Sequence, residues 1–115
     1  MGKLNRITVA LKQKIKNRKA TVAVIGMGYV GLSMACEFAR SGFKVIGIDT
    51  DTERVQAISK GESFLTDISS KVLKPLVRKG RLFATSSFAK LASADVIMIC
   101  VPTPLDKTQD PDLSF

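Results

Sequence analysis

Residues 21–31 join a β-branched run, Thr21-Val-Ala-Val-Ile25, to a glycine-rich turn, Gly26-Met-Gly28-Tyr-Val-Gly31. The apolar run has the length and composition of a strand that is buried on both faces, as in a parallel sheet. The turn fits the pattern G-x-G-x-x-G, which is weak alone and strong where it follows a strand and opens a helix. A helix is expected over residues 30–41, with Gly42 where a helix C-cap belongs. This context predicts a turn that binds a pyrophosphate.

Each glycine of the turn has a mechanical role. Gly26 permits the tight turn after the strand, Gly28 lets a pyrophosphate approach the backbone, and Gly31 lets the helix pack closely on the strand. Backbone N–H groups around Tyr29 and Val30 point toward an anion whose charge the helix dipole favours. The alternative is a glycine turn without a ligand.

An acid ends the second predicted strand, residues 44–48. This acid is Asp49, 18 residues after Gly31. A carboxylate there accepts hydrogen bonds from the adenosine ribose and repels the 2′-phosphate of NADP, so we predict that the cofactor is NAD. A helix-capping role for Asp49 is the alternative, although Asp51 fills that role better.

Two further residues are candidates for the same site. Arg54 lies one helical turn beyond Asp51, within reach of the adenosine or a phosphate. A solvated helix arginine or an ion pair with Asp51 is the alternative. Thr103 lies in Val101-Pro-Thr-Pro104, which follows the fourth predicted strand, and its hydroxyl or backbone can bond the nicotinamide-side ribose or phosphate. A rigid turn with an incidental threonine is the alternative there.

The other predicted elements alternate between helix and strand. In chain order they are a helix from Asp51 or Thr52 to about Lys60, a helix over 67–79 with a kink or break at Pro75, a strand over 82–85, a short helix over 87–92 and a strand over 95–101. Such alternation favours a parallel sheet with helices on both faces and the strand order 3-2-1-4. The predicted fold class is α/β, the N-terminal part of a Rossmann-type doubly wound sheet, because a full dinucleotide-binding sheet usually has six strands.

The basic charge of the chain is concentrated at the N-terminus. The net charge is +8, and residues 1–19 hold seven of the 18 basic residues and none of the 10 acidic ones. An amphipathic helix is expected over residues 4–18, because apolar residues recur there at spacings of three and four: Leu4, Ile7, Leu11 and Ile15. Such a helix can bind an anionic membrane or nucleic acid. Because the apolar stripe is short and lacks Trp or Phe, we favour packing on the domain or on a neighbouring subunit. The chain thus divides into this helix, residues 1–19, and a domain, residues 20–115.

The composition of the 115 residues excludes several classes of protein. Hydrophobic residues make up 45% and charged residues 24%, as in globular proteins. No run approaches the roughly 20 apolar residues that span a bilayer, and the N-terminus lacks the apolar core of a signal peptide. Histidine is absent, while Cys36 and Cys100 lie in apolar stretches typical of buried thiols in a reducing compartment. We expect a cytoplasmic protein without a metal site and without nucleic-acid or membrane partners.

On these motifs the chain resembles the UDP-sugar 6-dehydrogenase family, which includes the UDP-glucose, UDP-N-acetylglucosamine and UDP-N-acetylmannosamine dehydrogenases. The resemblance covers residues 20–115. It rests on Tyr29-Val30 inside the glycine turn, on Gly42-Phe-Lys-Val-Ile-Gly-Ile-Asp49, and on Cys100-Val-Pro-Thr-Pro104. The basic N-terminal helix and the ending Asp110-Pro-Asp-Leu-Ser114 are most similar to the UDP-N-acetylglucosamine branch.

The resemblance implies that the parent enzyme oxidises the C6 alcohol of a UDP-sugar to the carboxylate in two NAD-dependent hydride transfers. It assigns Tyr29 and Val30 to the pyrophosphate, Asp49 to the ribose, Arg54 to the adenosine side, and Thr103 to the cofactor. The family carries its catalytic residues in central and C-terminal segments that are absent here. We therefore expect this chain to bind NAD without turnover, with no catalytic role for Cys100, and the full-length protein to be a homo-oligomer.

A ligand-sensing Rossmann module, of the kind that regulates potassium transport, is the alternative from another class. Such modules share the glycine turn and the acid after the second strand. They are not expected to carry Val101-Pro-Thr-Pro104 or a helical insertion at 67–79.

Overall fold

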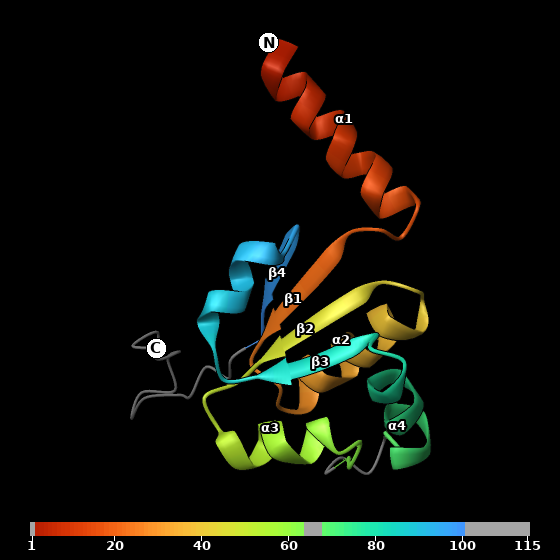
Figure 1. Ribbon diagram of the computed structural model, residues 1–115, viewed down its shortest axis with the longest axis vertical. Helices are drawn as coiled ribbons and strands as arrows, with labels where there is room; N and C mark the ends of the chain where they lie inside the picture. Colours follow the sequence, from red (N-terminus) through yellow and green to blue (C-terminus); the bar gives the residue numbers. More distant parts are fainter. Residues whose placement is uncertain (1, 64–67, 101–115) are drawn as a thin grey trace, which may run out of the picture.

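A computed structural model of the chain describes residues 2–63 and 68–100, with side chains described from residue 8 onward. Its elements are, in chain order, α1 (Gly2–Lys16), β1 (Thr21–Ile25), α2 (Tyr29–Arg40), β2 (Lys44–Ile48), α3 (Thr52–Ser59), α4 (Ser70–Arg78), β3 (Leu82–Thr85), the 3₁₀ helix η1 (Phe88–Ser93) and β4 (Val96–Ile99). The four strands form one parallel sheet in the order β3-β2-β1-β4 (Figure 1). This order confirms the prediction from the sequence.

The central strand of the sheet is β1, with a neighbour on each side. Val24 pairs with Gly47 of β2 and with Met98 of β4. After β3 the chain crosses back over β2 and β1 to reach β4, so the winding direction reverses between β1 and β4. In doubly wound sheets the ligand lies at this switch point, outside the carboxyl ends of the strands.

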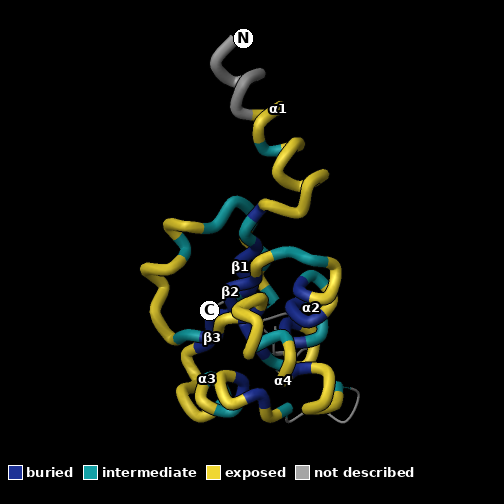
Figure 2. The backbone as a smooth tube through the Cα atoms, turned by 45° about the vertical axis from the view of Figure 1, so that its right-hand side comes forward, coloured by how far each residue is buried: buried dark blue, intermediate teal, exposed yellow. Residues whose placement is uncertain are grey.

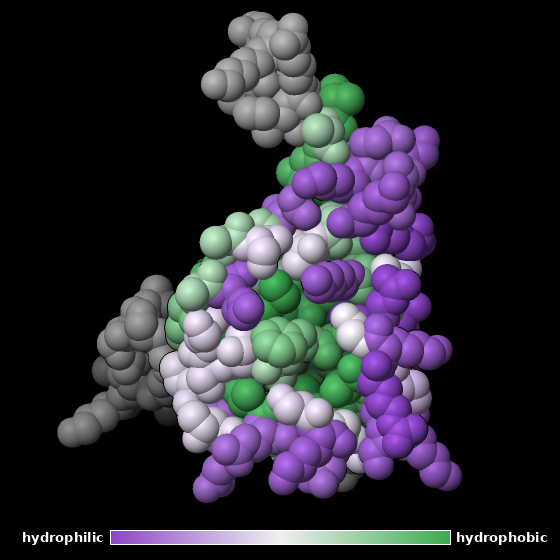
Figure 3. Space-filling model, in the orientation of Figure 1, coloured by the Kyte–Doolittle hydropathy of each residue, from purple (hydrophilic) through white to green (hydrophobic). Residues whose placement is uncertain are grey.

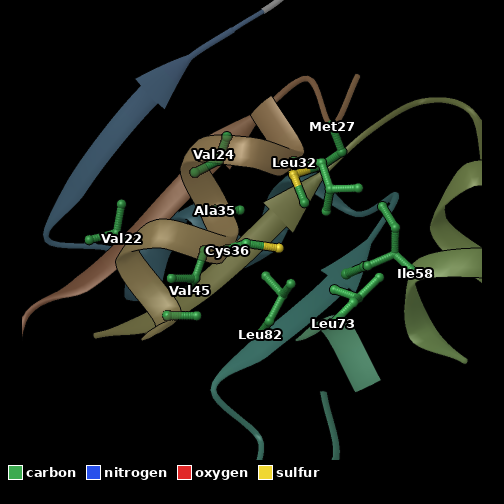
Figure 4. Packing of buried hydrophobic residues seen from close by; sticks show 12 residues of the cluster. Val22, Val24, Met27, Leu32, Ala35, Cys36, Val45, Ile58, Leu73 and Leu82 are labelled. Carbon is green, nitrogen blue, oxygen red and sulfur yellow. The ribbon is translucent and has the colours of Figure 1, made fainter. Parts of the chain in front are cut away.

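One face of the sheet carries the main core. Helices α2, α3 and α4 all cover this face, and their apolar side chains pack against alternate residues of the strands (Figure 4). Fully buried members include Val24 and Met27 beside the glycine turn, Leu32 from α2, and Leu73 from α4. Alternation along each strand produces this layer, because successive side chains of a strand point to opposite faces.

The opposite face is covered differently from our expectation of helices on both sides. Within the described residues only η1 crosses it, and Leu91 and Ala94 pack there against a small cluster formed by Ala23, Ile46 and Ile48. The crossover from β3 to β4 therefore runs over the second face, as a doubly wound sheet requires. Much of this face remains apolar and open, as the green centre of Figure 3 shows.

The last strand, β4, is less buried than its apolar sequence suggested. It spans Val96–Ile99, shorter than the predicted 95–101, and Ile97 and Ile99 are exposed, the latter by 70%. Both side chains lie on the open second face, where no helix covers them. Residue 101 lies outside the described residues.

The helix around Pro75 is continuous rather than broken. It begins at Ser70, later than the predicted residue 67, because Ser69 caps it by accepting a hydrogen bond from Lys71 N. Pro75 lacks one backbone donor, yet its carbonyl accepts from Lys79 N and the helix runs on to Arg78. Burial of Leu73 against the core stabilises the helix at this point.

Helix α1 projects away from the domain (Figures 1 and 2). Of the predicted apolar stripe, Ile15 is 42% exposed and Leu11 is half-buried, so Ile15 does not pack on this domain, and the side chains of Leu4 and Ile7 lie outside the described ones. Packing on a neighbouring subunit stays a prediction. Contacts at the end of α1 attach it to the sheet: Lys14 Nζ lies 3.2 Å from Asp95 Oδ1, and Asp95 Oδ2 accepts a hydrogen bond from Thr21 N. None of the helices in the described ranges has the length and hydrophobicity that would let it cross a membrane.

Candidate functional site

The glycine turn is held against the end of β2. Gly26 has a φ of 92°, in the left-handed region that favours glycine. Its N–H donates to Ile48 O at 2.7 Å, which fixes the start of the turn. The turn therefore begins with the conformation that the sequence predicted for Gly26.

The other two glycines of the motif have different surroundings. A Cβ on Gly31 would lie 1.6 Å from Gly26 O, so α2 rests directly on the backbone of the turn. A Cβ on Gly28 would meet its nearest neighbour, Arg54 Nη1, only at 3.7 Å. Gly31 is required by packing within the chain, whereas a Cβ on Gly28 would make only an ordinary contact with the end of a flexible side chain.

The N-terminus of α2 begins at this glycine. Gly28 is the N-cap residue and, as a glycine, has no side chain with which to cap the helix. Tyr29 and Val30 are each 59% exposed at the first turn. An open helix N-terminus offers backbone N–H groups and the positive end of the helix dipole to an anion.

Asp49 joins the glycine turn to the start of α3. Its Oδ2 accepts a hydrogen bond from Met27 N at 2.8 Å, and its Oδ1 accepts one from Asp51 N at 2.8 Å. Arg54 Nη1 lies 3.2 Å from Oδ2, and the carboxylate is only 9% exposed. A carboxylate has about four acceptor positions, so Asp49 still has capacity for a ribose hydroxyl. It also has a structural role that the sequence did not indicate.

The surroundings of Asp49 favour its ionised form. Burial of the carboxylate raises its pKa, but the hydrogen bonds from Asp51 N and Met27 N and the nearby Arg54 guanidinium outweigh burial. The pKa of Asp49 is therefore lowered from its ordinary value of 3.8. At neutral pH the site holds a carboxylate paired with a guanidinium.

Arg54 forms its ion pair with Asp49 and not with Asp51, which the sequence had offered as the alternative partner. Its guanidinium contacts Asp49, whereas Asp51 uses its side chain to cap α3 by accepting from Arg54 N at 3.1 Å. The predicted capping role of Asp51 is thus confirmed. The guanidinium of Arg54 therefore lies beside both Asp49 and Gly28.

Met27 is a residue of the site that sequence reasoning missed. Its N–H donates to Asp49, and its side chain is fully buried against β2. A Cβ on Gly47 would lie 2.5 Å from Met27 Cε, so the thioether occupies the space beside that glycine. Gly47 could have indicated that another side chain packs here, since a glycine inside a buried strand often marks the close approach of another group.

The end of β4 lies beside the glycine turn. Cys100 N donates to Ile25 O at 2.7 Å, and Cys100 Cβ is 3.5 Å from the place of a Cβ on Gly31. Thr103 and its flanking prolines lie outside the described residues. Desolvation by burial raises the pKa of Cys36 to about 11, so this thiol stays protonated at neutral pH. Within the described ranges no three His, Cys, Asp or Glu side chains gather as metal ligands would.

These features together fit a dinucleotide. The space at Gly28 admits a group close to the backbone, the N-terminus of α2 suits a negative charge, and Asp49 stands at the end of β2 with acceptor capacity left. The donors and acceptors present are those that a pyrophosphate and a ribose require.

Replacing Asp49 with alanine is expected to lower the free energy of unfolding by about 2 kcal/mol at pH 7. The substitution leaves the buried N–H of Met27 without its acceptor, which costs about 1–3 kcal/mol. Because the folded-state pKa of Asp49 lies below 3.8, its contribution is complete above that pH and is lost as the pH falls through the folded-state value. Urea unfolding of both proteins at pH 7 and pH 3 measures this. The difference in the free energy of unfolding between the wild type and Asp49→Ala should be smaller at pH 3 than at pH 7. The same difference at both pH values would contradict the stabilising role of the ionised Asp49 carboxylate.

Comparison with known proteins identifies the family of the chain. Residues 20–115 match the family model described as the NAD-binding domain of the UDP-glucose/GDP-mannose dehydrogenase family. UDP-N-acetyl-D-mannosamine dehydrogenase of Pyrococcus horikoshii is 38% identical over 95 residues, which are 82% of this chain and 22% of that protein.

Solved structures agree with this match. A GDP-mannose dehydrogenase of Pseudomonas aeruginosa superposes with a TM-score of 0.76 at 34% identity, covering 80% of this chain and 22% of that one. A UDP-glucose dehydrogenase of Pyrobaculum islandicum superposes with a TM-score of 0.76 at 30% identity, covering 83% of this chain and 22% of that one. The chain thus spans about a fifth of the length of these relatives.

Proposed function

The chain belongs to the UDP-glucose/GDP-mannose dehydrogenase family, as its NAD-binding domain, and from this we propose that it holds the cofactor for an enzyme that oxidises the C6 alcohol of a UDP-sugar to the carboxylate. Two NAD-dependent hydride transfers complete such an oxidation. The observation that carries the proposal is the glycine turn itself, in which Gly28 begins α2 without a side chain and lies beside the Asp49–Arg54 pair.

We propose the following binding roles, which rest on the resemblance to the family and on the geometry of the described residues. The turn Gly26–Gly31, with Tyr29 and Val30 at the N-terminus of α2, holds the pyrophosphate. Asp49 accepts from the adenosine ribose, and Arg54 contacts the adenosine side or a phosphate. Thr103 keeps its proposed place on the nicotinamide side of the cofactor.

The proposed substrate is UDP-N-acetylglucosamine or a close relative. The support is the resemblance of residues 1–19 and of the last residues to that branch. The three relatives described above are named for UDP-N-acetyl-D-mannosamine, GDP-mannose and UDP-glucose, so they support a nucleotide sugar as the class of substrate. We further propose that the N-terminal helix and residues 20–115 are separate units, and that the full-length protein is a cytoplasmic homo-oligomer.

The ligand-sensing regulatory module is less well supported. The matched family model and the superposed structures are all of dehydrogenases, and the match extends over the whole of residues 20–115. No observation in the described residues favours the sensing function over cofactor binding.

Calorimetric titration of the 115-residue chain is expected to show one saturable site for NADH and at least tenfold weaker binding of NADPH. The reason is the Asp49 carboxylate, which repels a 2′-phosphate at the ribose position. Titration with a UDP-sugar alone serves as the control and should give no heat of binding. Equal affinity for NADH and NADPH would contradict the role of Asp49. A folded chain that binds neither cofactor would contradict the proposed site.

A further inference from the structure

A band of basic side chains follows the amino ends of the parallel strands, at the edge of the sheet opposite the cofactor site. These exposed residues, here called the basic edge, precede or begin β1, β2 and β3: Arg18, Lys19, Lys44, Lys79 and Arg81. Figure 3 shows the hydrophilic surface running along this side of the molecule, from the lower end of α1 to α4. Charge that is dispersed in the sequence is thus gathered on one side of the fold.

Two of these arginines, Arg18 and Arg81, make contacts with the same loop. Arg18 adopts a φ of 59° at the end of α1, and its guanidinium lies 6.0 Å from the centre of the Phe43 ring. Arg81 Nη1 donates to Gly42 O at 3.1 Å. Both guanidiniums are therefore placed around the loop that joins α2 to β2.

Acidic groups do little to neutralise this edge. No Asp or Glu occurs in residues 68–94, which hold six basic residues. Asp95, just before β4, is already paired with Lys14 and with Thr21 N. Glu37 is paired with Arg40, at 3.7 Å.

Helix α1 continues the basic edge into solvent. It carries the exposed lysines Lys12 and Lys16, and it also exposes Ile15 and half-buries Leu11, two members of the apolar spacing seen in the sequence. A surface that is both basic and apolar along one helix is typical of a helix that lies in a membrane interface.

We propose that α1 and the basic edge bind an anionic lipid surface, with α1 lying in the interface. Nucleic acid would use the basic side chains but not the apolar ones. A second copy of the chain that met this one through the same basic edge would bring like charges together and be repelled at that surface. A bilayer with anionic headgroups uses both features, because lysines contact the headgroups while apolar side chains enter the acyl boundary.

This surface is independent of the proposed function. The cofactor site lies at the carboxyl ends of the strands and the basic edge at their amino ends, so both can be occupied at once. If the chain does not bind lipid, its binding of NADH should be unchanged. If it does not bind NADH, its binding of lipid should be unchanged.

The test is sedimentation of the full 115-residue chain with vesicles of phosphatidylcholine alone and of phosphatidylcholine with phosphatidylglycerol. We expect binding to the anionic vesicles only, weakening as salt is raised. Each basic residue near the surface raises partitioning by about fivefold. The triple variant Lys16→Gln, Lys19→Gln, Lys44→Gln should therefore bind about a hundredfold more weakly. Its control triple variant, Lys60→Gln, Lys71→Gln, Lys90→Gln, removes the same charge from three exposed positions outside the basic edge, at the end of α3, at the start of α4 and in η1. It should bind at least tenfold more tightly than the first triple variant.

A second pair of variants separates lipid from nucleic acid. Leu11→Gln with Ile15→Gln should weaken vesicle binding at least tenfold, because each loses the burial of an apolar side chain. Val9→Gln is the matched control, since Val9 lies roughly 200° around the helix from Leu11. Binding to neutral vesicles, equal effects of the two triple variants, or no effect of Leu11→Gln with Ile15→Gln would overturn the proposal. Tight binding to a double-stranded DNA oligonucleotide that survives Leu11→Gln with Ile15→Gln would assign the surface to nucleic acid instead.

Discussion

A Gly31→Ala substitution is expected to lower the free energy of unfolding by about 3 kcal/mol or more. The new Cβ would lie 1.6 Å from Gly26 O and 2.7 Å from Gly26 C. Both atoms belong to the backbone, so α2 must move off the turn, and overpacking of this kind costs typically 1–3 kcal/mol or more. A domain of this size has a total stability of about 5–15 kcal/mol, so the loss is large. Urea unfolding followed by far-ultraviolet circular dichroism measures it.

Gly80→Ala is the matched control for this experiment. Gly80 has a φ of +71°, and a Cβ there meets no atom within 4 Å. The control therefore reports only the backbone cost of a left-handed alanine, about 1–2 kcal/mol. Similar losses for Gly31→Ala and Gly80→Ala would show that the close contact between α2 and the turn is wrong.

A Gly28→Val substitution is expected to abolish NADH binding, by at least about a hundredfold, while the chain stays folded. Gly28 has a φ of −75°, which valine can adopt, and a Cβ there finds its nearest neighbour at 3.7 Å. The added side chain fills the space through which a pyrophosphate reaches the backbone. Calorimetric titration with NADH, together with urea unfolding of the same sample, tests both parts of the prediction.

The two glycine substitutions are expected to separate stability from binding. Replacing a glycine N-cap by valine costs on the order of 1 kcal/mol, so the Gly28→Val protein should lose much less stability than the Gly31→Ala protein and stay folded. The Gly80→Ala protein, changed at the opposite edge of the sheet, should bind NADH with wild-type affinity. Retained NADH affinity in a folded Gly28→Val protein would exclude the proposed pyrophosphate position.

The strands and the glycine turn were predictable because their signals lie between near neighbours in the chain. The runs at 21–25, 44–48 and 82–85 became strands with those bounds, and the spacing of Gly26, Gly28 and Gly31 placed a turn between β1 and α2. The continuity of the helix around Pro75 could not be predicted in this way, because proline by itself favours a kink or a break. Buried Leu73 keeps it continuous, and that burial depends on the sheet against which it packs.

The partners of the charged side chains were not predictable in the same way. Spacing offered Asp51 as the partner of Arg54, because the two are one helical turn apart. The structure pairs Arg54 with Asp49 instead, since Asp51 is engaged in capping α3. Met27 entered the site because the turn brings its N–H to the end of β2, 22 residues away in the chain.

Local spacing thus accounts for the fold class, the glycine turn and the acid after the second strand, because backbone geometry between near neighbours sets the period of a helix or a strand. Three features depend on contacts between segments that are distant in the chain: three helices packed on one face of the sheet, the bridging role of Asp49, and the projection of α1 with a basic edge beside it. Such contacts depend on how whole elements pack, and packing depends on the shapes of both partners at once.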